Sequence, residues 1–288
     1  GKGKKTWANG DVYIGEFKDG YLHGQGKKML NHGQVRSGEF KFNKLNGQGI
    51  QIFIDGSIYK GEWLNGLAHG FGTFDVRGEN GFKYQGDWKF DYRTGKGTQV
   101  GNSGYIYEGE FLDGDFSGYA DKYYHPSDNL NYVGEMKNNL FNGVGKLTYL
   151  DDGSYYEGEF FDDWPHGNGV YSWPDGQKYK GEFFESVFNG NGVMFYPNGE
   201  KYAGEFKDDL KHGSGIYTWP NGNSYNGQWK EGFFHGKGVV INADGSEFSG
   251  NFINDLEHGK AIFTDADKSI FNEIWEKGIL ISSVKKTN

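Results

Sequence analysis

Residues 202–222 have the sequence YAGEFKDDLKHGSGIYTWPNG, and close copies of it recur along the whole chain. Tyr202, Gly204 and Phe206 occupy alternate positions, which is the two-residue period of a β-strand. A second alternation ends at Trp219, and Pro-Asn-Gly at 220–222 supplies the backbone angles of a turn. The unit therefore predicts a β-hairpin that a second turn joins to the next hairpin.

The first aromatic residue of each copy marks a regular period. It stands at Tyr13, Arg36 (a substituted copy), Tyr59, Tyr84, Tyr107, Tyr132, Tyr156, Tyr179, Tyr202, Tyr225, Phe248 and Phe271. The intervals are 23 to 25 residues, and each copy can bury its apolar face only against its neighbours. The pattern therefore predicts an all-β, elongated, single-layer antiparallel β-hairpin solenoid of about twelve repeats.

We expect one continuous array over residues 1–284. It would comprise a partial repeat at 1–12, eleven repeats over 13–270 and a degenerate C-terminal cap at 271–284, with 285–288 as a tail. Because Gly1 already stands in mid-unit, we also expect native sequence upstream of it. At ~4.8 Å per strand, the array would be at most ~115 Å long.

Glycine normally weakens a strand, so its place inside this one needs a physical reason. Gly181, Gly204 and Gly227 share a face with large rings. A ring from a neighbouring strand can lie flat over a backbone that carries no Cβ. We therefore interpret these three as packing glycines, whereas Gly199 and Gly222 fit turns.

Several copies depart from the unit. Lengthened turns at 76–81 and 125–131 predict bulges or wider loops, either as tolerated drift or as recognition features. Residues 117–120, SGYA, lack the second glycine of the usual pair. Residues 270–278 would fit an amphipathic helix, but they align in register with 225–232, which favours a last degenerate strand.

Composition narrows the class of protein. The chain has 50 Gly, 20 Tyr, 24 Phe and 8 Trp, which suits glycine-backed aromatic packing rather than disorder. It has no cysteine, so it has no disulfide framework or thiol chemistry. A net charge of −9 disfavours nucleic acid and acidic lipid as partners. Neither a membrane-spanning apolar run nor a signal-peptide pattern is present in the sequence, and we expect a cytoplasmic protein.

Tyr-x-Gly-Glu-Phe/Trp, His-Gly-x-Gly and Asn/Asp-Gly, in register over nearly the whole chain, resemble the MORN (membrane occupation and recognition nexus) repeat. The resemblance implies a twisted sheet of successive hairpins, groove-shaped in section. MORN arrays occur in junctophilins, plant phosphatidylinositol phosphate kinases, a histone lysine methyltransferase, protozoan cytoskeletal scaffolds and ciliary radial spoke head proteins. The first three join the array to a transmembrane helix or catalytic domain, and these 288 residues contain neither. The resemblance therefore favours the stand-alone ciliary and cytoskeletal members.

Two sets of polar residues, histidines and glutamates, recur once per repeat and are candidates for a metal or catalytic site. Equivalent residues of adjacent hairpins lie ~10 Å apart, which is too far for one metal ion or one catalytic carboxylate pair. We therefore predict structural histidines in a common turn position and a solvated or locally hydrogen-bonded acidic ridge. The histidines are His23, His69, His166, His212, His235 and His258, and the acids are Glu16, Glu39, Glu62, Glu110, Glu135, Glu159, Glu182 and Glu205. No nucleotide-loop or hydrolase motif occurs, so we predict no catalytic, metal or cofactor site.

These observations predict a non-catalytic structural and protein-interaction scaffold, in a cilium or axoneme (radial-spoke-like) or in the cytoskeleton. The alternatives are a phospholipid or membrane-apposition module, and the accessory array of an enzyme whose catalytic domain is not in this chain. We expect a partner helix or extended peptide to bind an aromatic groove. The predicted groove residues are Tyr156, Phe160, Tyr179, Phe183, Tyr202, Phe206, Tyr225 and Trp229.

Other arrangements stay open. The rival site is the C-terminal edge near Ile279-Leu280-Ile281, where a partner strand could pair. The rings could also saturate one another and leave no groove. A homodimer is a further arrangement that the sequence allows.

Overall fold

The computed structural model describes residues 1–287, which contain strands and turns and no helix. The predicted all-β class of successive antiparallel hairpins is confirmed. By Cα proximity the chain divides into two compact units, Gly1–Leu150 and a second that begins at Asp151. The prediction that both belong to one continuous array stays a prediction. None of the described residues forms a helix that could cross a membrane.

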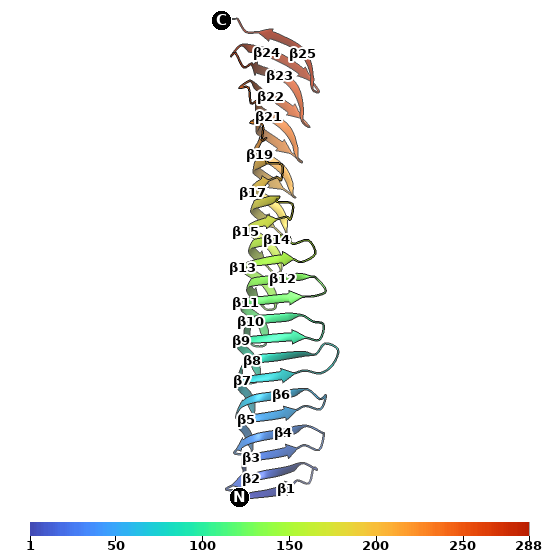
Figure 1. The fold of residues 1–288 in the computed structure, drawn as a ribbon, viewed down its shortest axis with the longest axis vertical. Coiled ribbons are helices and arrows are strands. Elements are labelled where there is room, and N and C mark those ends of the chain that lie inside the picture. Colours follow the sequence, from blue (N-terminus) through green and yellow to red (C-terminus); the bar gives the residue numbers. More distant parts are fainter. Residues whose placement is uncertain (288) are drawn as a thin grey trace. The chain divides into compact units, whose positions relative to one another are not determined.

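The first unit is an open antiparallel sheet in which each strand pairs with its neighbours in sequence (Figure 1, blue to green). Its strands are β1 (Lys2–Thr6), β2 (Val12–Lys18), β3 (Tyr21–Met29), β4 (Val35–Lys41), β5 (Lys44–Ile52), β6 (Ile58–Leu64), β7 (Leu67–Asp75), β8 (Phe82–Lys89), β9 (Tyr92–Gly101), β10 (Ile106–Leu112), β11 (Asp115–His125), β12 (Leu130–Lys137) and β13 (Leu140–Tyr149).

The second unit repeats this arrangement with a stricter period. Its strands are β14 (Tyr155–Phe161), β15 (Trp164–Ser172), β16 (Lys178–Phe184), β17 (Val187–Phe195), β18 (Lys201–Lys207), β19 (Leu210–Thr218), β20 (Ser224–Lys230), β21 (Phe233–Ile241), β22 (Glu247–Ile253), β23 (Leu256–Thr264), β24 (Ile270–Glu276) and β25 (Ile279–Lys285).

A tight turn closes each hairpin and also contacts the previous hairpin. In the β18–β19 turn, Asp208 and Asp209 have φ of 49° and 65°, a left-handed conformation that Asp tolerates. Asp209 Oδ1 accepts a hydrogen bond of 2.7 Å from the backbone N–H of Phe188 on β17. The Asp255 carboxylate accepts the same bond from Phe234 N–H at 2.7 Å. Each such turn therefore joins consecutive hairpins as well as reversing the chain.

The strand glycines pack beneath tyrosine rings as predicted, except that the ring over Gly204 comes from its own strand rather than from a neighbouring one. A Cβ built on Gly215 would lie 2.4 Å from the Tyr202 hydroxyl and 2.5 Å from Tyr202 Cε2. One built on Gly204 would lie 2.4 Å from Gly215 Cα and 2.7 Å from the same hydroxyl. The ring that covers the pair thus belongs to the same hairpin, and the two backbones approach more closely than any residue with a Cβ permits.

The lengthened turn at 76–81 lies wholly between β7 and β8, as a wider loop, whereas the irregular copy around β10 and β11 is largely absorbed within strands. Of the predicted loop at 125–131, only 126–129 lies between strands, and β10 and β11 take up the other extra residues through register shifts. The helix considered for 270–278 is wrong, because β24 pairs with β23 and β25 there. The last strand ends at Lys285, one residue beyond the predicted cap, and residue 288 of the predicted tail lies outside the described residues.

Candidate protein-interaction surface

The eight aromatic residues predicted to line a groove form the core of the second unit. Their exposed fractions are 0% for Tyr156, Tyr179, Tyr202 and Tyr225, and 4% for Phe160, Phe183, Phe206 and Trp229. The Tyr202 ring meets Phe206 and Trp229 edge-on, each at 5.0 Å between centroids. These rings are therefore buried, which agrees with the alternative that the rings saturate one another rather than line an open groove. Whether a partner contacts any of the eight stays a prediction.

Their polar atoms are also used internally. The Tyr202 hydroxyl donates a hydrogen bond of 2.8 Å to the backbone carbonyl of Glu205, three residues on. The Tyr225 hydroxyl does the same to Gln228 at 2.8 Å. Burial raises the pKa of the Tyr225 hydroxyl to about 12 and raises the pKa of Tyr202 as well. These hydroxyls brace the strand rather than serve as proton donors to a ligand.

The acidic ridge is locally hydrogen-bonded, one of the two interpretations made from the sequence. The second strand of each hairpin carries a bulge, which leaves a backbone N–H without a ladder partner. Glu205 Oε1 accepts a hydrogen bond of 2.8 Å from this N–H on Ser214, and Glu182 Oε1 accepts one of 2.8 Å from Asn191. Gln228 makes the equivalent bond to Lys237 N–H at 3.0 Å. Hydrogen bonding, not charge, is what this position requires.

The six histidines lie in the second strands, not in the turns where the sequence placed them. His212, for example, pairs with Glu205 across β18–β19 at the bulge. The His69 and His166 rings contact Phe90 and Phe184 of the next hairpin at 5.2 and 5.3 Å. Over residues 1–287, no three His, Asp or Glu side chains are grouped so as to hold a metal ion.

The face opposite the rings carries an apolar line that the sequence analysis did not single out. We call it the aliphatic stripe; its members are Val170, Val193, Ile216, Val239 and Ile262. Ile216 and Ile262 are 45% and 50% exposed, and the three valines are half-buried. The sequence does contain a signal for this stripe, a Val or Ile at a constant 23-residue interval. The aromatic residues of the repeat are larger and obscure that signal.

Strand register aligns the stripe. Reading across β15 to β23, Val170 pairs with Lys180, Lys180 with Val193, Val193 with Ala203, Ala203 with Ile216, Ile216 with Asn226, Asn226 with Val239, Val239 with Ser249, and Ser249 with Ile262. Small or polar residues thus separate successive aliphatic ones. The first unit has Lys27, Ile50, Thr73, Thr98 and Lys146 at the equivalent positions, so the stripe is confined to the second unit.

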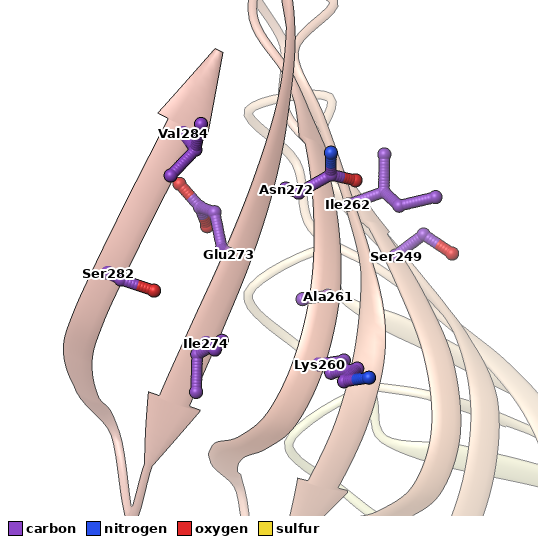
Figure 2. A pocket seen from close by; sticks show the side chains of 9 residues that line it. All are labelled: Ser249, Lys260, Ala261, Ile262, Asn272, Glu273, Ile274, Ser282 and Val284. Carbon is purple, nitrogen blue, oxygen red and sulfur yellow. The ribbon is translucent and has the colours of Figure 1, made fainter. Parts of the chain in front are cut away.

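Two hollows lie along the stripe. One, of about 660 Å³, is lined by Val170, Val193 and Ala203. The other, of about 610 Å³, is lined by side chains of β22 to β25, including Ile262, Ile274 and Val284 (Figure 2). Gly181, Gly192 and Ala203, which have no side chain or a short one, are among the residues that line the first hollow. The surface is apolar and recessed, as docking surfaces are.

The MORN repeat model matches eleven segments of the chain, at 1–12, 13–29, 37–58, 59–75, 84–104, 132–154, 156–178, 179–201, 202–224, 225–247 and 248–270. The chain belongs to the MORN repeat family. The MORN repeat is a non-catalytic repeat module, and the matched segments cover most of the hairpins described above. The longest unmatched stretch is 105–131, with the shifted register of β10 and β11; residues 30–36, 76–83, 155 and those beyond 270 are not matched either.

Comparison with solved structures finds distant likenesses to this MORN chain. The TCP domain of SAS-4 (dCPAP) from Drosophila melanogaster, in complex with a proline-rich motif of Ana2 (dSTIL), is 11% identical at a TM-score of 0.32, over 61% of this chain and 82% of that one. The TCP10 domain of Danio rerio CPAP, in complex with a STIL peptide, is 10% identical at 0.27, over 99% and 100%. A streptogramin B lyase is 14% identical at 0.15, over 94% and 89%. Such low scores carry no argument about function, and no curated protein matches the sequence.

The C-terminal edge of the MORN array, predicted as a rival site, is apolar. β25 pairs only with β24 among the described residues. Its side chains Ile279, Ile281 and Val284 are 66%, 57% and 63% exposed. The strand at the other end of the sequence, β1, instead carries Lys2, Lys4 and Lys5, and such charges oppose strand addition. Among the described residues, β25 therefore presents exposed aliphatic side chains next to the hollow in Figure 2.

Proposed function

We propose that this MORN array is a non-catalytic protein-interaction scaffold that holds an amphipathic helix of a partner along the aliphatic stripe. The observation that carries the proposal is the alignment of five Val and Ile side chains across β15 to β23, with a hollow near each end. A soluble surface rarely repeats an exposed aliphatic residue in register without a ligand for it.

The spacing of the stripe supports a helix. Two strands per hairpin at ~4.8 Å place successive stripe residues ~9.6 Å apart. A helix advances ~10.5 Å in seven residues, so an apolar residue in every heptad would meet one stripe residue each. The stripe crosses nine strands, or ~38 Å, which about 26 helical residues would span. This binding mode is an apolar helix face laid in a groove.

Site-specific cross-linking tests the proposal. A photo-reactive amino acid is placed at Ile216 in cells, and at Ile50 as the matched control, because Ile50 is the lone aliphatic residue at the equivalent position in the first unit. We expect position 216 to cross-link a partner segment with apolar residues at heptad spacing. Ile216→Asp combined with Ile262→Asp should abolish that cross-link, and Ile50→Asp should leave it intact.

Two results would contradict the helix proposal. Equal cross-linking from positions 50 and 216 would mean that the stripe is not selective. Cross-linking from a third probe at Ile281 on β25, with none from position 216, would instead favour addition of a partner strand, or of a second copy of this chain, at the edge where Ile279 and Ile281 are exposed.

The cellular setting is a separate part of the proposal. We place this scaffold in the cytoplasm, in a cilium or the cytoskeleton, with support from the acidic charge of −9, the absence of cysteine and the resemblance to stand-alone arrays. Fluorescent tagging in a ciliated cell tests it, and a diffuse or membrane-bound signal would count against it.

A further inference from the structure

The second hairpin of the first unit lacks its tyrosine. Arg36 on β4 stands where nine other hairpins have a buried Tyr, and it is half-buried. The ring that would cover Gly49 is therefore missing. A Cβ built on Gly49 would meet Trp63 Nε1 at 3.1 Å and Leu45 Cδ2 at 3.1 Å, and no tyrosine. The side chains of Trp63 and Leu45 thus lie over Gly49 in place of a tyrosine ring.

The shift of Trp63 leaves its indole N–H without a partner. In hairpins whose predecessor keeps its tyrosine, the equivalent tryptophan donates to a glycine carbonyl of that predecessor. Trp88 Nε1 donates to Gly72 O at 3.3 Å, and Trp229 Nε1 donates to Gly215 O at 3.1 Å. Trp63 Nε1 is buried and makes no such bond. A buried donor without an acceptor is costly, so its persistence calls for an explanation.

A second substitution opens space beside Trp63. The residue paired with the strand aromatic is Leu22 opposite Phe17 and Leu45 opposite Phe40, but it is Ala68 opposite Trp63. The result is a hollow of about 360 Å³ on the ring face. Its walls are Phe53, Tyr59, Trp63, Ala68, Phe74 and Trp88, with Arg36, Gln51 and Asp91 as polar groups.

Three buried polar atoms without partners line this one hollow: Arg36 Nε, Gln51 Oε1 and Trp63 Nε1. Gln51 is 5% exposed and Trp63 is 6% exposed. Gln51 pairs with Arg36 on one side and with Tyr59 on the other, so adjacent strands hold these groups together. Residues that carry two unpaired donors and one unpaired acceptor therefore line an aromatic chamber whose size suits one side chain and its amide.

We infer that this hollow is a binding site for a neutral secondary amide that carries an aromatic or large aliphatic group, such as one residue within a peptide. The amide oxygen would accept from Trp63 Nε1–H and Arg36 Nε–H, and the amide N–H would donate to Gln51 Oε1. The side chain would pack against Phe53, Phe74 and Trp88. Arg36 and Asp91 carry opposite charges, so the lining favours a neutral ligand over a carboxylate.

The site goes beyond the proposed function, because it lies in the first unit and no residue of the aliphatic stripe contributes to it. Loss of one would leave the other intact. Asp substitutions at Ile216 and Ile262 should accordingly not change binding in the Arg36 hollow.

The test is an NMR titration of the 15N-labelled chain, with the tryptophan indole N–H signals as the readout. The probe is N-acetyl-phenylalanine methylamide, and N-acetyl-phenylalanine is the carboxylate comparison. We expect a saturable downfield shift of the Trp63 signal with the amide only. Trp63→Phe identifies that signal and should weaken binding about three- to tenfold, since one hydrogen bond is lost. Trp229→Phe, in the second unit, is the control and should leave the affinity for the amide and the shift of the Trp63 signal unchanged.

Ala68→Leu is the decisive variant. Leucine occupies the same register position in the two preceding hairpins, so this change should fill the hollow, abolish binding and leave the melting temperature unchanged or higher. Unaltered probe binding in Ala68→Leu would overturn the site. The absence of a saturable shift with the amide would also overturn it, and saturation by the carboxylate alone would overturn the assignment of the ligand.

Discussion

Replacing Gly204 with alanine tests the close approach of the two strands in a MORN hairpin. The new Cβ would lie 2.4 Å from Gly215 Cα and 2.5 Å from Ser214 O, both backbone atoms, whereas ordinary contact for a Cβ begins at 3.4 Å. Strands β18 and β19 would have to separate by about 1 Å. Overpacking of this kind costs about 3 kcal/mol, and the lower entropy of an unfolded chain with alanine returns about 0.5–1 kcal/mol. We expect a net loss of about 2–2.5 kcal/mol, and more for Gly204→Val.

Two further variants separate backbone contact from ring contact. Gly215→Ala would place its Cβ 2.4 Å from the Tyr202 hydroxyl, so the buried ring must tilt and its bond to Glu205 O weakens. We expect a loss of about 2 kcal/mol, slightly less than for Gly204→Ala. Gly3→Ala is the matched control, because its Cβ would meet only Phe17 at 3.4 Å. That change should stay within about 0.5 kcal/mol.

The assay is hydrogen exchange of β18 and β19 peptides, with the urea midpoint of unfolding measured in parallel. Exchange reports the local opening free energy of this hairpin, which a shift in a distant hairpin does not mask. Gly204→Ala and Gly215→Ala should both accelerate exchange there, and Gly3→Ala should not. If Gly204→Ala leaves exchange unchanged, or if all three variants behave alike, then strand glycines are not required by close packing.

Four other outcomes are expected. Glu205→Gln should be nearly silent and Glu205→Ala should cost about 1 kcal/mol in urea unfolding, because Gln228 already makes the equivalent bond to Lys237 N–H; equal losses would mean that charge matters. Phe206→Ala should cost about 3–5 kcal/mol, since Phe206 is 4% exposed, and a loss below about 1 kcal/mol would contradict its place in the core. The folded pKa of Tyr225 is about 12 against 10.0 for the free side chain, so its contribution to stability should persist below pH 10 and fall as the pH rises from 10 towards 12, which urea midpoints across that range would check. Finally, vesicles rich in acidic lipid should retain little of this chain at physiological salt, given its charge of −9, and tight salt-sensitive sedimentation would revive the membrane alternative.

Sequence alone was sufficient for the hairpin, the period and the family. Alternation at Tyr202, Gly204 and Phe206 is a local property of a strand, and turn residues such as Asp208 carry their backbone preference wherever they stand. The role of Gly204 also followed, because a glycine beside large rings has few other uses. Even the hydrogen-bonded state of Glu205 was one of two foreseeable outcomes.

Exposure was decided only by the tertiary structure. Whether the Tyr202 ring is buried depends on Trp229 from the next hairpin and on a hydroxyl that reaches a carbonyl, and neither contact is visible in a periodic pattern. The aliphatic stripe likewise needs the register that aligns Val193 with Ala203 and Ala203 with Ile216.

The same holds for the hollow in the first unit. In the sequence, Arg36 marks a substituted copy of the repeat, and nothing in the pattern singles out Ala68. The structure makes them one feature, because Arg36 lies beside Gln51, Gln51 beside Tyr59, and Ala68 opposite Trp63 across four consecutive strands. Local chemistry thus determines which strands and turns form. Which polar atoms lack partners depends on how side chains of different strands pack together. That packing is defined only once the strands have paired.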